Sequence, residues 1–417
     1  MVDHIHFSYR PVVVAFGLAF CSAALAQEAV RMSLSGEAAE QARKSAAATP
    51  DYYNIRLGPT VWSFAAGLDF EENDNIRFDS HDAKADLALR PQLDSRMDWR
   101  VSDKNSINLA LGAGYSAYLQ HSELDRFFVA PGSELSLDLY AGDLWFNFHE
   151  RLSITKNAYE DPTVVGSADY SQLQNTAGLT GTWDLNKLVL KLGYDHADYS
   201  ELTGGGGVPD GQSEISSFSA GLHFGPGIEA GLESGGGLTC YSGQNTIIKQ
   251  ATDWNAGAFL EAQPMQYVHL RAAAGYTVYS PQSSVAQGAA NEFTGVYARL
   301  DLSHRLNRFL EYTLNGGRTI SFGFFGGTID LYQAALQARW HLFQKMSAGT
   351  WFGFEHGSQV LAGQETFDRY GPGLSLERPI TRRMSGSVRY QYYQRHSDIP
   401  GGDYTVNIVT MSFAYRL

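Results

Sequence analysis

The feature that most constrains this chain is a two-residue alternation of apolar and polar side chains, repeated from residue 55 to the end. Between Ile107 and Leu119 every odd-numbered residue is apolar, and the residues between them are small or polar. This period places the two sets on opposite faces of a β-strand. Typical soluble strands span roughly five or six residues, whereas a tilted strand needs about nine to eleven to cross a membrane. The long runs therefore predict membrane-crossing strands.

The links between the alternating runs differ regularly in length. Short links are expected at Ala141-Gly142, Leu185-Asn186, Gly225–Gly227, Gln263-Pro264, Leu306-Asn307, Gln344-Lys345 and Pro379, and long polar links at Glu71–Asp82, His121–Gly132, Asn157–Asp169, Glu201–Gly211, Pro281–Ala290 and Asp398–Gly402. Outer-membrane barrels combine tight periplasmic turns with long external loops, and a soluble sandwich does not sort its loops in this way. The pattern predicts an all-β fold, a closed antiparallel transmembrane β-barrel of about 18 strands, with about 16 as the alternative.

The chain begins with the three parts of a signal peptide, expected over residues 1–26. Arg10 ends a polar region, Pro11–Phe20 is apolar, and Ala24-Leu25-Ala26 provides a cleavage site. A lipoprotein signal at Cys21 is the alternative, although the bulk of Phe20 disfavours it. Residues 27–54 are expected to form a periplasmic segment, and residues 55–417 the barrel. An exported barrel is predicted to lie in the outer membrane of a Gram-negative cell, among lipid and lipopolysaccharide.

The last strand alternates up to the final residue. Its apolar positions are Val409, Met411, Phe413, Tyr415 and Leu417. This resembles the C-terminal signal by which outer-membrane proteins engage the barrel-assembly machinery, although that signal usually ends in Phe. An ordinary amphipathic strand is the alternative interpretation.

Closure would bring basic side chains from many strands around one lumen. The lumen-lining candidates are Arg151, Lys191, Arg271, Arg299, Arg339 and Arg389, and Lys187, Arg383 and Arg395 share their expected phase. Acidic residues are expected to be fewer on this face, including Asp138, Asp195 and Asp301. Because the net charge is −13, most negative charge is expected in loops and turns. A basic constriction favours anions. The alternative is that these bases pair across the lumen and only stiffen the wall.

Two stretches, Leu68–Phe78 with Leu87–Leu93 and then Gly132–Ile154, resemble the β-barrel porin type 2 family. In the second stretch Glu150 stands where that family usually has Asp. The resemblance implies an outer-membrane barrel without catalytic residues, and some relatives are associated with exopolysaccharide export. The function expected is a porin-like channel for small, possibly anionic solutes. The alternative is the outer-membrane component of exopolysaccharide export, with periplasmic partners.

No pattern in the chain predicts an enzyme, a cofactor or a nucleic-acid partner. The 12 histidines are scattered, and the sequence fixes no His–Ser or Asp–His geometry. After cleavage Cys240 stands alone, which excludes an internal disulfide and a cysteine metal cluster. An acidic cluster that could bind Ca²⁺ comprises Glu71, Glu72, Asp74, Asp79 and Asp82. Its spacing is not that of an EF-hand, so a solvated loop is preferred.

Overall fold

The computed structural model describes residues 53–154, 165–166, 171–202, 210–242, 248–283, 293–322, 328–359 and 365–417. The expected signal peptide and most of the periplasmic segment lie outside these residues. The strands are β1 (Ile55–Leu57), β2 (Thr60–Asn73), β3 (Asp86–Arg100), β4 (Ser106–Tyr118), β5 (Arg126–Ala141), β6 (Leu144–Ile154), β7 (Gln172–Asp184), β8 (Leu188–Glu201), β9 (Asp210–Gly225), β10 (Ile228–Ser242), β11 (Ile248–Met265), β12 (Val268–Ser283), β13 (Phe293–Arg305), β14 (Leu310–Phe322), β15 (Thr328–His341), β16 (Ser347–Gln359), β17 (Thr366–Pro379), β18 (Met384–Ser397) and β19 (Tyr404–Arg416). Two 3₁₀ turns, η1 (Ser122–Leu124) and η3 (Phe343–Lys345), lie between strands.

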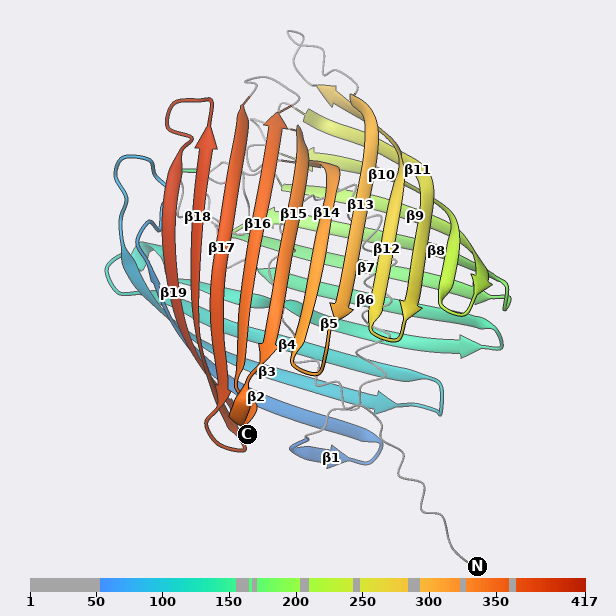
Figure 1. Cartoon of the computed structure of the whole chain (residues 1–417), viewed down its shortest axis with the longest axis horizontal. Coiled ribbons are helices and arrows are strands. Elements are labelled where there is room, and N and C mark those ends of the chain that lie inside the picture. The colour runs from blue at the N-terminus through green and yellow to red at the C-terminus, as the bar shows by residue number, and fades with distance from the viewer. Residues whose placement is uncertain are drawn as a thin grey trace, which may run out of the picture.

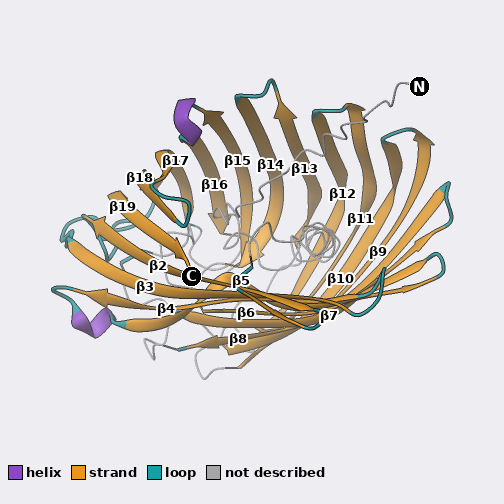
Figure 2. Ribbon diagram, turned by 90° about the horizontal axis from the view of Figure 1, so that it is seen from below, coloured by secondary structure: helices purple, strands orange, loops and turns teal. Residues whose placement is uncertain are grey.

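The strands β2 to β19 form one closed antiparallel barrel. Each pairs with its neighbours in sequence, and β19 pairs with β2, so that 18 strands complete the ring. This confirms the predicted fold class and strand number. Figure 1 shows β12–β18 upright in front of far-wall strands that run nearly across the view, and Figure 2 shows a flattened ring. Strands β3–β8 form one long side of that ring, β12–β16 form the other, and β9–β11 turn the corner between them. No helix among the described residues is both long and apolar enough to span a membrane.

Short turns gather at the end of the barrel that holds the C-terminus, and longer links gather at the other end. These are named the short-turn end and the long-loop end. The tight turns after β5 and β9 contain Gly142 and Gly227, whose φ angles are +65° and +73°, a conformation that suits glycine. The predicted alternation of link length is confirmed. Several boundaries were wrong: Gln263-Pro264 belongs to β11, Pro379 to β17, Gly211 to β9 and Pro281 to β12, and β5 already begins at Arg126.

The outer face of the barrel is apolar. Leu192, Leu232 and Leu374 on β8, β10 and β17 are 64%, 66% and 59% exposed. Aromatic side chains flank this belt on the same face, with Trp183 and Trp340 toward the short-turn end. Such a surface is unfavourable in water and suits an apolar surrounding.

The seam between the first and last barrel strands is short. Pairing of β19 with β2 extends only from Arg416 opposite Ala65 to Ile408 opposite Asn73. Strand β1 pairs with the first residues of β2. Because β3 occupies the other edge of β2 from Thr60 onward, β1 lies on the edge that β19 leaves free.

Side chains extend the seam at both ends. At the short-turn end, the Asn54 side-chain oxygen accepts a hydrogen bond from the Phe64 N–H at 2.6 Å, and its amide donates to the Leu417 carbonyl. At the long-loop end, the two Asp74 carboxylate oxygens accept from the backbone and side-chain amides of Asn407, each at 2.7 Å. These contacts join segments from opposite ends of the chain.

We expect Asn54→Ala to weaken the seam, because it removes the hydrogen bond that the Asn54 amide donates to Leu417 and the one that its oxygen accepts from Phe64. Each lost bond lowers the free energy of unfolding by about 1 kcal/mol. Urea unfolding of the barrel in lipid vesicles measures this loss. Arg56→Ala is the control, since Arg56 is exposed on β1 close to Asn54 and should keep the parental stability. Equal stability of Asn54→Ala and the parent would contradict the role given to Asn54.

Candidate functional site in the barrel lumen

The six basic residues predicted to line the lumen all lie at inward-facing positions of their strands. They are Arg151 on β6, Lys191 on β8, Arg271 on β12, Arg299 on β13, Arg339 on β15 and Arg389 on β18. Arg395 also faces inward and is fully buried. Lys187 and Arg383 differ from the expectation, because both lie in short turns rather than on the wall. Counting alternate residues along the sequence assigns these two turn residues to the same face as the strand residues, and the structure distinguishes the two groups.

Acidic side chains are as frequent on the inner face as basic ones, so the expectation of fewer acids was wrong. Besides Asp138, Asp195 and Asp301, the inward acids include Asp69, Glu71, Asp94, Asp98, Glu134, Glu229, Glu233, Asp253, Glu261, Glu311, Glu355 and Glu377. In β10 the inward face carries Gly231, Gly235 and Gly237 beside the two glutamates. The alternation of Ile228 and Leu232 with Glu229 and Glu233 is the sequence signal that could have placed these acids inward.

Most of the predicted basic residues have an acidic neighbour. The Nε atoms of Arg151 and Arg299 lie 3.0 Å from Glu134 Oε2 and 2.7 Å from Asp301 Oδ2, respectively. The other pairs are looser: Arg271 Nη2 is 3.7 Å from Glu233 Oε2. Close pairing neutralises charge and fixes side chains, so the bases differ in how much positive charge they present to the lumen.

Arg339 and Arg389, two more of the six predicted basic residues, lie in one part of the lumen. Arg339 Nη1 lies 4.0 Å from Glu311 Oε1, and Arg305 Nε lies 4.0 Å from the other oxygen of the same carboxylate. The Arg389 guanidinium carbon is 6.0 Å from the centre of the Trp351 ring. Glu311 thus faces two guanidinium groups at distances beyond a normal hydrogen bond.

These residues line a cavity of about 630 Å³ at the short-turn end, named the vestibule. Its lining includes Arg305, Glu311, Arg339, Trp351, Glu377 and Arg389. A second, smaller space of about 90 Å³ lies where the long sides of the ring converge, and is named the corner cavity. Lys191, Arg271 and Arg299 line the corner cavity, whereas Arg151 lines neither space.

A buried polar network stiffens the wall formed by β5 to β8. Asp138 Oδ1 accepts hydrogen bonds from Trp145 Nε1 at 3.1 Å and from Asn147 Nδ2 at 2.9 Å. The ring nitrogens of His149 lie 3.0 Å from Asn147 Oδ1 and 2.7 Å from Asp195 Oδ1. Because both nitrogens of His149 have carbonyl or carboxylate partners, this histidine is placed to hold the wall rather than to activate a nucleophile.

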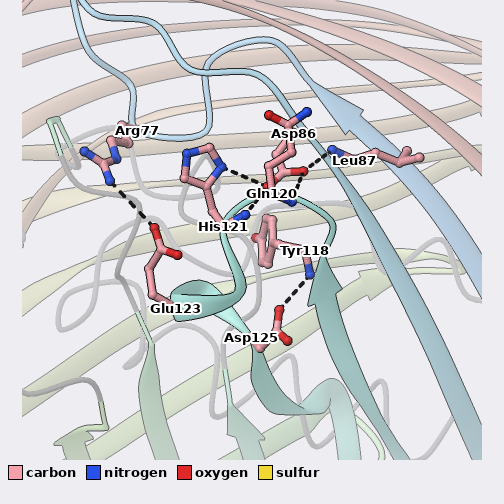
Figure 3. A network of polar contacts seen from close by, with 8 residues as sticks. All are labelled: Arg77, Asp86, Leu87, Tyr118, Gln120, His121, Glu123 and Asp125. Atoms are coloured by element: carbon pink, nitrogen blue, oxygen red, sulfur yellow. Dashed lines mark hydrogen bonds and ion pairs between the residues drawn. The ribbon is translucent and has the colours of Figure 1, made fainter.

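The first two long links are joined by a second network (Figure 3). The Asp86 carboxylate accepts from the backbone N–H groups of Gln120 and His121, and Oδ2 lies 2.9 Å from His121 Nδ1. Arg77 Nη2 and Glu123 Oε1 are 3.9 Å apart across the same links. This network orders the long-loop end above β2–β5.

The acidic cluster of the first long link is dispersed. Glu71 pairs with Arg90 inside the barrel, and Asp74 binds Asn407 at the seam. The backbone N–H groups of His81 and Asp82 donate to Asp79 and hold its pKa below the usual value. Within the described residues no group of three His, Cys, Asp or Glu side chains could hold a metal ion.

Solved structures share the fold of this chain. A scan against family models and a search of curated proteins both find no match, so the type 2 family resemblance stays a prediction. Pseudomonas aeruginosa OccK2 (OpdF) in complex with glucuronate is 13% identical, with 87% of this chain and 100% of that chain covered and a TM-score of 0.50. Pseudomonas aeruginosa OpdK with vanillate is 12% identical, with the same coverage and TM-score. A BenF-like porin from Pseudomonas fluorescens Pf-5 is 9% identical, again covering 87% and 100% at a TM-score of 0.50. At these identities the likeness establishes the fold alone.

We expect Gly178→Ala to destabilise the barrel. Gly178 on β7 lies beneath the contact between His149 and Asp195, and an added Cβ would overlap the Asp195 carboxylate and stand 2.6 Å from His149 Nε2. Overpacking of this kind lowers the free energy of unfolding by about 1–3 kcal/mol, measured by urea unfolding in lipid vesicles. Gly181→Ala is the matched control on the same strand, because its nearest neighbour is 3.4 Å away. Equal losses in the two variants would contradict the bridging role of Gly178.

Proposed function

We propose that this chain is an outer-membrane channel through which small polar solutes diffuse passively, with a preference for anions. The observation that carries the proposal is the vestibule, a space of about 630 Å³ enclosed by the barrel and lined by polar and charged side chains. A closed barrel with a polar interior and an apolar exterior satisfies its backbone hydrogen bonds without water, as a membrane requires. The predicted signal peptide supports export to the outer membrane.

The preference for anions rests on the residual charge of the vestibule rather than on the net charge of the chain. Arg305 and Arg339 share one carboxylate, Glu311, at 4.0 Å each. Arg389 adds a third guanidinium on the same wall, where its neighbour is an aromatic ring. Glu377 also lines this space, so three guanidinium groups stand against two carboxylates, and the remaining positive charge lowers the energy of a passing anion. The neighbours with glucuronate and vanillate suggest carboxylates as the solutes.

Two further roles follow as part of this proposal. The outward face of β19, which carries Val409, Met411, Phe413 and Tyr415, would engage the assembly machinery during insertion. Lipid and lipopolysaccharide would cover the apolar belt. A channel needs no catalytic residue, and no contact in the described part of the chain favours exopolysaccharide export over a channel.

We expect the purified protein to conduct in planar bilayers, with chloride more permeant than potassium. The double variant Arg339→Gln, Arg389→Gln should lower the chloride-to-potassium permeability ratio by at least about fivefold, because even one unit charge about 4 Å from an ion changes its energy by ~1 kcal/mol in water-filled space. Reversal potentials in a KCl gradient measure the ratio. The difference between the parent and the variant should shrink in concentrated salt, because salt screens the charges.

Arg382→Gln is the control for this experiment. Arg382 is exposed in the short turn between β17 and β18 and does not line the vestibule. This variant should keep the parental permeability ratio. Cation preference in the parent protein would contradict the anion proposal, and absence of any conductance would contradict the channel itself.

A further inference from the structure

The link between β2 and β3, residues 74–85, turns into the barrel at the long-loop end and is named the inner link. Phe78 in this link is 2% exposed and packs against three buried side chains of β19, which are Tyr404, Val406 and Ile408. Met411 on the same strand is 48% exposed on the outer face. Because successive side chains of a strand point to opposite faces, the three even-numbered residues face the lumen. Phe78 therefore lies inside the barrel.

Polar contacts hold the inner link beside β19. Asn75 is 2% exposed, and its side-chain amide donates to the carbonyl oxygens of Asp79 at 2.8 Å and Thr405 at 3.0 Å. The Asn75 side-chain oxygen accepts from the Asp79 N–H at 3.0 Å. The Phe78 carbonyl accepts from the Gly166 N–H at 3.2 Å. Asn75 thus shapes the turn that carries Phe78 and binds that turn to the last strand.

The inner link is also packed against the second long link. Ile76 contacts Leu124 of η1, and Tyr118 packs against both. The contact between Asp86 and His121, shown in Figure 3, joins the bases of the same two links. The two links therefore form one body above β2–β5, and Phe78 fastens this body to the inner face of β19.

The inner face beneath Phe78 is shielded from water, whereas the vestibule is not. Glu71 and Arg90 form an ion pair just below the inner link, and they are 4% and 3% exposed. Thr410, the next inward residue of β19 after Ile408, is 9% exposed. In the vestibule, the Arg305 side chain is 46% exposed. The lumen is thus open at the short-turn end and covered at the long-loop end beside β19.

The backbone of Phe78 is strained. Its φ angle is +54°, in the left-handed region that bulky side chains rarely adopt. Such a conformation persists only where its surroundings hold it, and residues of this kind gather at segments that switch between two arrangements. Burial of the ring against β19 favours the inward position, and the strained backbone opposes it. The position of the inner link therefore depends on the contact that Phe78 makes.

We propose that the inner link is a gate at the long-loop end of the lumen and that Phe78 is its latch. In the closed form the Phe78 ring packs on β19 and the link covers Glu71 and Arg90. In the open form the ring leaves β19, the backbone of Phe78 relaxes, and water and solutes reach the inner face of β19. This inference rests on the proposed channel function and names the element that controls passage.

Two substitutions of the latch test the gate. Phe78→Ala and Phe78→Asn both remove the ring, and asparagine also tolerates the left-handed conformation, so the second variant keeps the turn without strain. In planar bilayers the parent should occupy a larger-conductance level only briefly. Both variants should raise the ratio of time at that level to time at the smaller level by about tenfold or more, since the burial of one phenylalanine no longer favours the closed form.

A cysteine beneath the link reports the same movement without conduction. Cys240 is replaced by serine, and Thr410→Cys places a thiol on the inner face of β19. A water-soluble methanethiosulfonate should modify this thiol slowly in the folded, detergent-solubilised parent and about tenfold faster or more when Phe78→Asn is added. Ser387→Cys, in the lining of the vestibule, should react at one rate in both backgrounds.

Phe127→Ala is the matched control for the loss of a phenylalanine. Phe127 lies at the long-loop end of β5, where it is 54% exposed on the outer face and does not contact the inner link. This variant should keep the parental conductance levels and the parental rate at Thr410→Cys. Heat-modifiability on gels establishes that every variant forms the folded barrel before measurement.

The gate and the channel fail separately in this design. Parental dwell times and parental labelling in both Phe78 variants overturn the gate and leave the channel standing. Faster labelling at Thr410→Cys in a protein that conducts in no variant supports the latch and overturns the channel. Faster labelling together with longer occupancy of the larger level supports both.

Discussion

The pairing of β19 with β2 is the interaction on which the rest of the structure depends. An open sheet of this size would leave a row of backbone donors and acceptors without partners at each edge, and in lipid no water could replace them. The register from Arg416 opposite Ala65 to Ile408 opposite Asn73 removes both edges. Asn54 and Asp74 extend this seam with side-chain hydrogen bonds where backbone pairing stops. Closure therefore depends on segments that are the most distant in the chain.

Closure also determines what the interior must contain. Once the apolar set faces outward, the alternate set is confined to a narrow lumen, where unpaired charges are costly. The wall meets this constraint with pairs such as Arg299–Asp301 and with networks such as His149–Asp195. Glycines at crossing points, among them Gly178 and Gly275, let long side chains reach partners two or more strands away. Small residues on the inner face are thus part of the polar architecture.

The sequence predicts the barrel well and its lumen only in part. Alternation and link length are local properties, so the strands, their closure and the inward position of residues such as Arg271 and Arg339 are accessible from residue order. The charge balance of the lumen is not accessible from residue order, because it depends on which residues lie opposite one another. Glu229 and Glu233 alternate with Ile228 and Leu232, so their inward phase can be read from the sequence, but the residues that lie opposite them follow only from the register with β9 and β11. The hydrogen bond from Tyr297 on β13 to Glu233 on β10, which passes over two strands, likewise has no signal in the sequence.

Selectivity in such a lumen depends on the charge that pairing leaves over, rather than on the number of basic residues. A close pair such as Arg151–Glu134 presents little field to a solute, because its charges cancel at short range. In the vestibule, one carboxylate between two guanidinium groups leaves a diffuse positive wall, suited to attraction without tight binding. In the corner cavity, Arg299 Nε lies 2.7 Å from Asp301 and Arg271 Nη2 lies 3.7 Å from Glu233, so less positive charge remains there. The same residue types thus present different fields in the two spaces, and the difference arises from which partners each side chain already has.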